Sequence, residues 1–329
     1  MDYHSIYKTE TPEFLLRLCQ TAPLRRLADV GMNCGCEYTA FPRFASIARY
    51  TRFEHSLGAA LIVWRFTRDE AQSAAALLHD IATPVFAHVV DFLRGDYLEQ
   101  TATESGTAEL IRESAEIGAI LRGLGLRPED VEDYHRFPVA DNDPPRLSAD
   151  RLDYTCGNAV NFSLASREEL SELLEDLNVG QNEYGETELI FRHAGAALRF
   201  AGIALDCSKI YVCDADRYAM QRLSELLRAA LSAGVIGEGD LASTEEALVE
   251  KLLADPRCAA EWAAFRALSR TERAARADER DGWRKISAKK RRIDPFVAGR
   301  GRASALDGAF AAALSAFMNG DQDYFVRGE

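Results

Sequence analysis

The stretch LLHDIATPVFAH, residues 77–88, places His79 and Asp80 side by side within an apolar run that His88 closes. Adjacent residues on a helix point about 100° apart, so a neighbouring His and Asp fill a core poorly. The chain has six histidines, and two of them stand in this one segment. A buried polar pair needs partners for its charge and its hydrogen bonds, and a coordinated ion is one such partner.

The segments around this stretch carry apolar residues at three- and four-residue spacing, which predicts helices. They are rich in Ala, Leu, Glu and Arg, which favour helix intrinsically. The predicted helices cover residues 12–20, 55–69, 69–81, 107–125, 167–177, 216–234 and 306–317. The sequence therefore predicts a mainly all-α fold.

Strand alternation is rare in the chain. The best candidates are CEYTAF at residues 36–41 and a hairpin over residues 186–202, in which ETELIFR and ALRFAG flank a turn at HAG. An irregular connection is the alternative for the second segment, and residues 137–150 are rich in turn formers. We expect a helical bundle with at most one short β-hairpin.

Composition restricts the class of protein. Thirty-nine basic and 52 acidic residues give a net charge of −13, which argues against nucleic acid as a partner. The seven cysteines are scattered and fit reduced thiols, and Cys34 and Cys36 are too close together for the usual zinc spacing. No run of about 18 apolar residues occurs and the first residues do not read as a leader, so we expect a cytoplasmic protein without a membrane partner.

Four side chains could gather around one ion. His55, the pair His79-Asp80, and Asp150 lie in or at the ends of predicted helices, next to small or apolar neighbours. Three segments of a bundle could bring two imidazoles and two carboxylates together, which suits Mn, Fe, Co, Ni or Zn and, less comfortably, Mg. The alternative for each histidine alone is a hydrogen-bonded core residue, but that alternative explains the His-Asp pair less well.

These motifs resemble the HD-domain metal-dependent phosphohydrolases, which are named for a His…His-Asp…Asp pattern. The resemblance is strongest to the deoxynucleoside triphosphate triphosphohydrolase (dNTPase) branch, in YTRFEHSLGAA (50–60), LLHDIATPVFAH (77–88) and ADRLDYT (149–155). It implies an HD-type catalytic domain over residues 1–221 and an accessory helical region over residues 222–329. It also implies a divalent ion held by His55, His79, Asp80 and Asp150, and hydrolysis of a nucleotide phosphate ester by a metal-bound water.

Further site residues follow from the same resemblance. His88 and Asp91 would lie on one helical face, where the carboxylate can orient the imidazole for acid–base work or for phosphate binding. An ordinary helix-cap pair is the alternative. Phosphate contacts are expected from Arg52, Arg151, Lys209 and Arg217. The remaining substrate contacts are expected from Tyr154 and Tyr211, although core packing is an equal alternative for Tyr211.

The chain also departs from the branch pattern. Thr83 and Thr103 stand where the branch has histidines, Ala82 replaces a loop glycine, and Asn158 replaces an acid. A phosphatase for nucleoside monophosphates or other esters, and a nucleotide-sensing protein with weakened catalysis, therefore stay open as alternatives. A cyclic-dinucleotide phosphodiesterase is disfavoured because the Gly-Tyr-Pro element is absent.

The most basic segment is KISAKKRRIDPF, residues 285–296. In allosteric relatives the C-terminal region assembles subunits around nucleotides, which leaves a homo-oligomer open. A solvated surface strip is the plainer interpretation of this segment. No glycine-rich phosphate loop or dinucleotide fingerprint is present.

Overall fold

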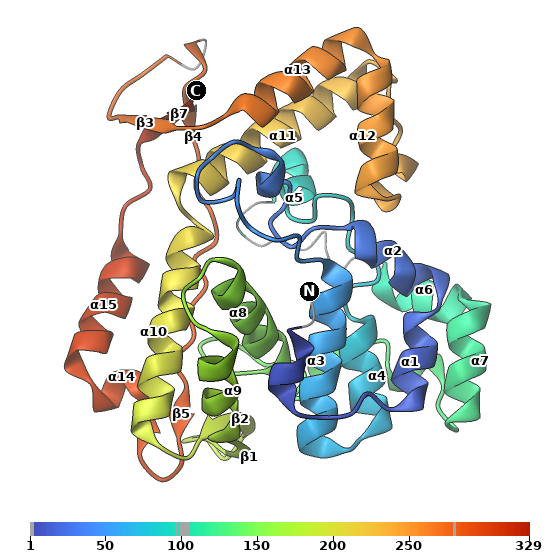
Figure 1. Ribbon diagram of the computed structural model, residues 1–329, viewed down its shortest axis with the longest axis vertical. Helices are drawn as coiled ribbons and strands as arrows, with labels where there is room; N and C mark the ends of the chain where they lie inside the picture. Colours follow the sequence, from blue (N-terminus) through green and yellow to red (C-terminus); the bar gives the residue numbers. More distant parts are fainter. Residues whose placement is uncertain (1–2, 97, 99–105, 279–280) are drawn as a thin grey trace.

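The computed structural model describes residues 3–96, 98, 106–278 and 281–329. Helices dominate it (Figure 1), as the sequence predicted. The α-helices before the first strand are α1 (Glu13–Cys19), α2 (Ala22–Arg26), α3 (Arg52–Thr67), α4 (Glu70–Leu78), α5 (Val89–Arg94), α6 (Thr107–Glu113), α7 (Ala115–Gly123), α8 (Ala149–Asn161) and α9 (Arg167–Glu175). The later ones are α10 (Ala194–Ile210), α11 (Asp214–Ser232), α12 (Glu245–Ala254), α13 (Pro256–Ala267), α14 (Ala303–Leu306) and α15 (Gly308–Asn319).

Two small sheets accompany the helices among the described residues, with strand orders β1-β2-β5-β6 and β3-β7-β4. The strands are β1 (Leu177–Gln181), β2 (Thr187–Phe191), β3 (Thr271–Ala274), β4 (Arg284–Lys285), β5 (Phe296–Val297), β6 (Gly301–Arg302) and β7 (Phe325–Gly328). β1 and β2 are antiparallel, with Leu177 opposite Phe191. The chain thus has more strands than the single hairpin that the sequence predicted.

Two of the predicted strands are wrong. β2 is a strand, but its hairpin partner is β1, which precedes it, and ALRFAG lies within α10. The buried residues there recur at helical spacing: Ala197, Phe200, Ala201 and Ala204. The apolar residues therefore follow the 3.6-residue period of a helix and not the two-residue alternation of a strand. CEYTAF contains only a short 3-10 helix, Cys36–Tyr38.

The predicted helix over 107–125 is two helices. Ser114 has an extended backbone, with φ −73° and ψ 107°, and separates α6 from α7. Its hydroxyl accepts a hydrogen bond of 3.3 Å from the amide of Ile117, which caps the second helix. A mid-helix serine was therefore the signal for a break.

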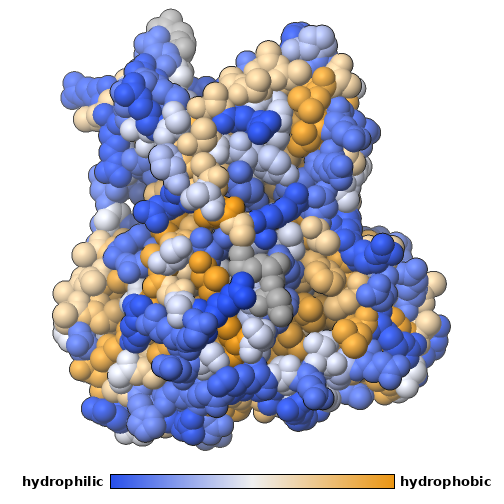
Figure 2. Space-filling view, in the orientation of Figure 1, coloured by the Kyte–Doolittle hydropathy of each residue, from blue (hydrophilic) through white to orange (hydrophobic). Residues whose placement is uncertain are grey.

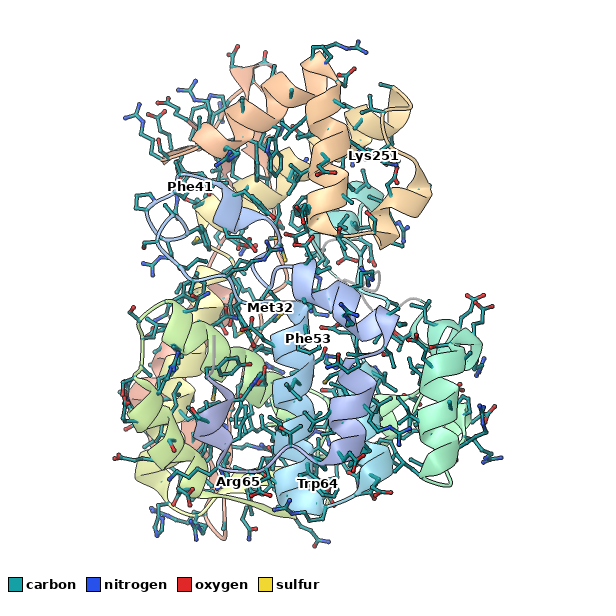
Figure 3. All side chains as sticks on the ribbon, turned by 45° about the vertical axis from the view of Figure 1, so that its right-hand side comes forward. Met32, Phe41, Phe53, Trp64, Arg65 and Lys251 are labelled. Atoms are coloured by element: carbon teal, nitrogen blue, oxygen red, sulfur yellow. The ribbon has the colours of Figure 1, made fainter. Side chains whose placement is uncertain are left out.

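The buried side chains form two large clusters that meet at the waist of the molecule. The first holds α3, α4 and α8 in the lower part of Figure 1, where α3 packs on both of the others. The second holds α5, α11 and α13 in the upper part. Figure 3 shows Met32 between the two parts. α11 runs through residues 221 and 222, and the boundary placed there stays a prediction.

The surface is mixed. Hydrophilic residues cover most of the face in Figure 2, with apolar side chains between them. Among the helices of the described residues, none combines the length and the apolar character that a membrane span requires.

Candidate metal centre

α3 places His55 in its first turn through a local signal. Thr51 caps the helix, since its hydroxyl accepts from the amide of Glu54 at 3.3 Å and its own amide donates to the Glu54 carboxylate at 2.9 Å. This Thr-x-x-Glu arrangement is a capping box. One turn later, a Cβ on Gly58 would lie 1.7 Å from a carboxylate oxygen of Asp153. Only glycine at that position lets α3 and α8 approach closely enough to set His55 against α8.

His79 and Asp80 immediately follow the last residue of α4. The Nδ1–H of His79 donates to the carbonyl of Ala76 at 2.7 Å, which leaves Nε2 facing the cavity residues. The carboxylate of Asp80 accepts from Arg52 Nη1 at 2.9 Å and from the Thr83 hydroxyl at 2.9 Å. Both side chains are almost fully buried.

Asp150 comes from the first turn of α8. Ser148 caps this helix, because its hydroxyl accepts from the amide of Arg151 at 3.3 Å. The Oδ1 atom of Asp150 lies 3.0 Å from Nε2 of His55 and 3.6 Å from Nε2 of His79. The first turn of α3, the end of α4 and the first turn of α8 therefore bring the predicted residues to one place.

Four separations among these donor atoms are compatible with ligands of a single divalent ion. His55 Nε2 lies 4.0 Å from Asp80 Oδ2, and His79 Nε2 lies 3.6 Å from the same oxygen. Two ligand atoms about 2.1 Å from one ion lie roughly 3.0 Å apart at right angles and roughly 4.2 Å apart on opposite sides. All four separations fall in that range. Within the described residues, donor atoms of His55, His79 and Asp80 all lie within 4.8 Å of one another, and this group does not include Asp150.

Asp153 fixes the orientation of His55. Its Oδ2 atom lies 2.8 Å from Nδ1 of His55, so the imidazole turns Nε2 toward the carboxylates. The hydroxyls of Tyr3, Tyr7 and Tyr50 also donate to the Asp153 carboxylate, at 2.9, 2.5 and 2.8 Å. Such a carboxylate–histidine pair sets the tautomer of a metal ligand and raises its basicity.

Opposite charges at the centre stabilise one another and shift the pKa values of His55 and Asp80. Burial lowers the pKa of His55, but hydrogen bonds to Asp150 and Asp153 outweigh that effect and raise the pKa to about 10. Burial raises the pKa of Asp80, but Arg52 and the two imidazoles hold it well below its usual range. A proton on His55 Nε2 thus stands among carboxylates where a cation is favourable, and a bound metal would replace that proton.

His88 forms the predicted pair with Asp91. Its Nδ1 lies 2.9 Å from the Asp91 carboxylate, which is fully buried. Burial, together with the nearby charges of Arg291 and Arg52, lowers the pKa of His88 to about 4 against the raising effect of Asp91. His88 is therefore a neutral imidazole near pH 7.

One cavity connects these groups. It has a volume of about 170 Å³ and includes the four candidate ligands and His88 in its lining. Three of the six predicted substrate contacts also line it, namely Arg52, Tyr154 and Tyr211. The ring centroids of Tyr154 and Tyr211 lie 6.2 Å apart at 74°, so the two tyrosines form one wall.

The other three predicted contacts do not line this cavity. Arg151 donates instead to Arg146 and Asn142 in the preceding loop. Lys209 is exposed and pairs with Asp206 at 2.9 Å.

Arg217 is fully buried, and its guanidinium is held by Asp214 and the Tyr324 hydroxyl. Of the positions that depart from the branch pattern, Thr83 is buried against Asp80 and Asn158 lines the cavity, whereas Thr103 lies outside the described residues.

The cavity also contains residues that the sequence reasoning missed. Asn33, Asp216 and Arg291 line it, and each comes from a different part of the chain. The basic run at 285–296 was the only signal for Arg291, and it did not indicate which of its cations faces inward. Isolated polar residues such as Asn33 and Asp216 carry no periodic signal at all.

No family model matches the chain. The fold is nevertheless shared with solved structures. A hypothetical protein from Aquifex aeolicus aligns with a TM-score of 0.64 at 20% identity, over 96% of this chain and 92% of that one. A phosphohydrolase from Bacteroides thetaiotaomicron aligns with a TM-score of 0.64 at 14% identity, over 96% and 94%. These likenesses establish the fold.

Two curated proteins are also similar to the chain in sequence. The chain is 27% identical over 296 residues to the metal-dependent phosphohydrolase Cns2 of Cordyceps militaris. The alignment covers 87% of this chain and 81% of that protein. It is also 25% identical over 242 residues to the uncharacterized protein YdhJ of Bacillus subtilis, over 73% and 71%. The similarity to Cns2 supports a metal-dependent phosphohydrolase and does not decide a branch.

Proposed function

We propose that this protein is a metal-dependent phosphohydrolase that acts on a nucleotide, with dNTP triphosphohydrolysis as the first candidate reaction. His55, His79, Asp80 and Asp150 would hold the divalent ion. The observation that carries the proposal is the convergence of these donor atoms, 3.0–4.0 Å apart, on the wall of one cavity. The similarity to a metal-dependent phosphohydrolase over most of the chain supports it.

The side chains around the centre have distinct tasks in this reaction. A bound divalent ion polarises a phosphate oxygen and lowers the pKa of a coordinated water. Asp153 keeps His55 turned toward the ligand set through its 2.8 Å contact. Arg52 keeps Asp80 ionised and oriented through its 2.9 Å bond. The ligands are therefore held in place before a substrate enters.

His88 is the candidate acid–base group. Its Nδ1–H is held by Asp91, so Nε2 is the atom at which it takes up a proton and passes it to the leaving oxygen. The neutral imidazole at pH 7 can take up that proton without first losing one. Its place on the wall of the same cavity supports this role.

The nucleotide part of the proposal rests on the aromatic wall. The ring of Tyr154 is near both the metal centre and Tyr211, at 6.4 Å from the ring of His55 and 6.2 Å from that of Tyr211. An aromatic wall beside a phosphate site suits a ligand with a flat or apolar body next to its phosphate. A nucleotide meets this description.

The test is a substrate panel. The full chain is loaded with Mn²⁺ or Mg²⁺ in parallel and incubated with dNTPs, NTPs and nucleoside monophosphates, and products are separated by anion-exchange chromatography. Release of triphosphate from dNTPs is the expected result. Asp80→Ala serves to exclude a contaminating phosphatase, and Asp206→Ala, at an exposed aspartate, is the matched control.

Other outcomes separate the alternatives. Release of orthophosphate from monophosphates would replace the triphosphohydrolase assignment by a nucleotidase. Nucleotide binding without hydrolysis would contradict the enzymatic proposal and favour a sensing protein. The bond from Thr83 to Asp80 is the observation behind that second candidate, because a threonine there supplies no imidazole to the reaction.

A further inference from the structure

A segment from the C-terminal part of the chain covers the cavity. We call residues 286–295, which connect β4 to β5, the strap; Figure 1 shows it descending from the upper sheet to the lower one. Ala288, Lys289 and Arg291 of the strap line the cavity of the metal centre. The segment that the sequence interpreted as a surface strip thus reaches the candidate active site.

The strap is anchored on both sides of Arg291. The amide of Ala288 donates to the Gln322 side chain at 3.0 Å, and the ammonium of Lys290 donates to the carbonyl of Met318 at 2.9 Å. On the other side, the amide of Asp294 donates to the carbonyl of Pro145 at 2.8 Å. Arg291 is therefore carried by a fixed stretch of backbone rather than by a loose tail.

Arg291 contacts the candidate acid–base residue directly. Its Nη2 atom lies 3.1 Å from Nε2 of His88, and its guanidinium lies 6.0 Å from the centroid of the Tyr154 ring. A guanidinium only donates hydrogen bonds, so Nε2 of His88 is the acceptor and Nδ1 carries the proton that is donated to Asp91. The arginine thereby joins the strap to the His88–Asp91 pair.

The other arginine of the cavity contacts a candidate metal ligand. Arg52 donates to the Asp80 carboxylate at 2.9 Å and is 7% exposed. Its charge is therefore balanced largely by that of a candidate metal ligand. Arg291 contacts the neutral imidazole of His88, and both residues line the same cavity. A guanidinium offers paired N–H donors whose geometry matches two phosphate oxygens.

We propose that Arg291 binds the phosphate group on which the enzyme acts, so that the strap forms part of the active site. This inference rests on the proposed function. When phosphate enters, the guanidinium turns from His88 Nε2 to the phosphate oxygens and leaves that nitrogen open to the leaving group. Arg291 is then a substrate-binding residue, and it acts on proton transfer through His88.

Phosphate affinity tests the proposal separately from turnover. Isothermal titration calorimetry would measure binding of inorganic phosphate to the full chain loaded with Mn²⁺. Arg291→Gln should weaken binding about ten- to a hundredfold, because a charge-assisted hydrogen bond is lost, and Arg291→Lys should restore part of the affinity. Arg292→Gln, at the exposed neighbouring residue, is the matched control and should bind phosphate as the wild type does. Manganese content should be equal in all four proteins.

Unchanged phosphate affinity in Arg291→Gln at equal manganese content would overturn the inference. If that variant does not fold, phosphate should protect Arg291, and not Arg292, from phenylglyoxal in the wild type, and equal modification of both would overturn it instead. Failure of the proposed function looks different: phosphate binds through Arg291, yet no ester of the substrate panel is hydrolysed. Conversely, Arg291→Gln could hydrolyse the substrate with unaltered KM and phosphate affinity. That result would contradict the role of Arg291 and leave the proposed function standing.

Discussion

Two sets of polar residues line the same cavity, and they differ in how their hydrogen bonds are satisfied. In the first set, His55, His79 and Asp80 each have a protein partner at 2.7–2.9 Å. In the second set, Asn33 Nδ2 and Asp216 Oδ2 are buried polar atoms that have no hydrogen-bond partner among the described residues. The hydrogen bonds of the first set are satisfied within the protein, and those of the second set are not.

Under the proposed function, this difference would separate the residues that hold the ion from residues that meet the substrate. Each buried polar atom without a partner costs about 1–3 kcal/mol, so a folded protein keeps few of them. Such atoms in a cavity wall are explained when a ligand or water supplies the missing bond. The paired residues, in contrast, are oriented before any ligand arrives. Substitutions in the two sets should therefore have effects of different kinds.

The largest effect is expected from Asp80→Ala. This change removes a candidate ligand and leaves the Arg52 guanidinium buried without its carboxylate partner. Turnover should fall about 10³-fold or more, and metal content, measured by inductively coupled plasma mass spectrometry, should fall with it. A variant that keeps full activity would refute the ligand assignment, and Asp206→Ala should retain both properties.

His88→Ala should have the next largest effect, and only on the rate. The change removes the acid–base group but none of the four candidate ligands, so kcat should fall about 10²- to 10⁴-fold at unchanged metal content. Steady-state kinetics and metal analysis on the same preparation check both quantities. Loss of the metal would show instead that His88 is a ligand.

The paired set could be predicted because its signals are local. Thr51-x-x-Glu54 marks the start of α3 within four residues, and the His79-Asp80 pair is conspicuous by itself. The packing that brings Asp150 to them is not local, and the resemblance to a known family supplied it. Mainly helical structure was likewise predictable, since helices arise from contacts three and four residues apart.

The rest depended on contacts that no local pattern encodes. Arg291 meets His88 across 203 positions, and nothing in the run KKRRIDPF distinguishes it from Arg292. The partner of β2 was missed because β1 is short and directly follows the helix α9. Asn33 is one polar residue in a loop, and only the folded chain shows that it faces a cavity.

Asp153→Asn should affect the paired set more mildly. Asp153 is not a candidate ligand, but it orients His55, and loss of such a partner lowers metal affinity about 10- to 100-fold. Titration of Mn²⁺ would measure the affinity, and circular dichroism would confirm that the variant is folded. Tyr7→Phe, which removes one hydroxyl from the same carboxylate, should have a smaller effect in the same direction. Unchanged metal affinity in Asp153→Asn would show that packing alone orients His55.

Asp216→Asn tests the unpaired set and should have the smallest effect on turnover. Burial raises the pKa of Asp216 to about 8, against the lowering effects of Cys36, Arg217 and Arg291, whereas an unfolded aspartate titrates near about 3.9. Between these values the folded protein holds a proton that the unfolded chain has lost, so the free energy of unfolding falls as pH rises. Asparagine resembles the protonated acid and removes this penalty.

The variant should therefore be more stable than the wild type at pH 8 and nearly equal to it at pH 4.5, as urea denaturation at both values would show. Asp206→Asn, at an exposed aspartate, should leave the pH dependence unchanged. Because the amide still offers a donor to the cavity, kcat should stay within about tenfold and the change should appear mainly in KM. A wild-type pH dependence in Asp216→Asn would mean that this carboxyl is ionised in the folded protein. The unpaired set would then present a negative charge to the substrate, where a neutral acid is expected from its burial.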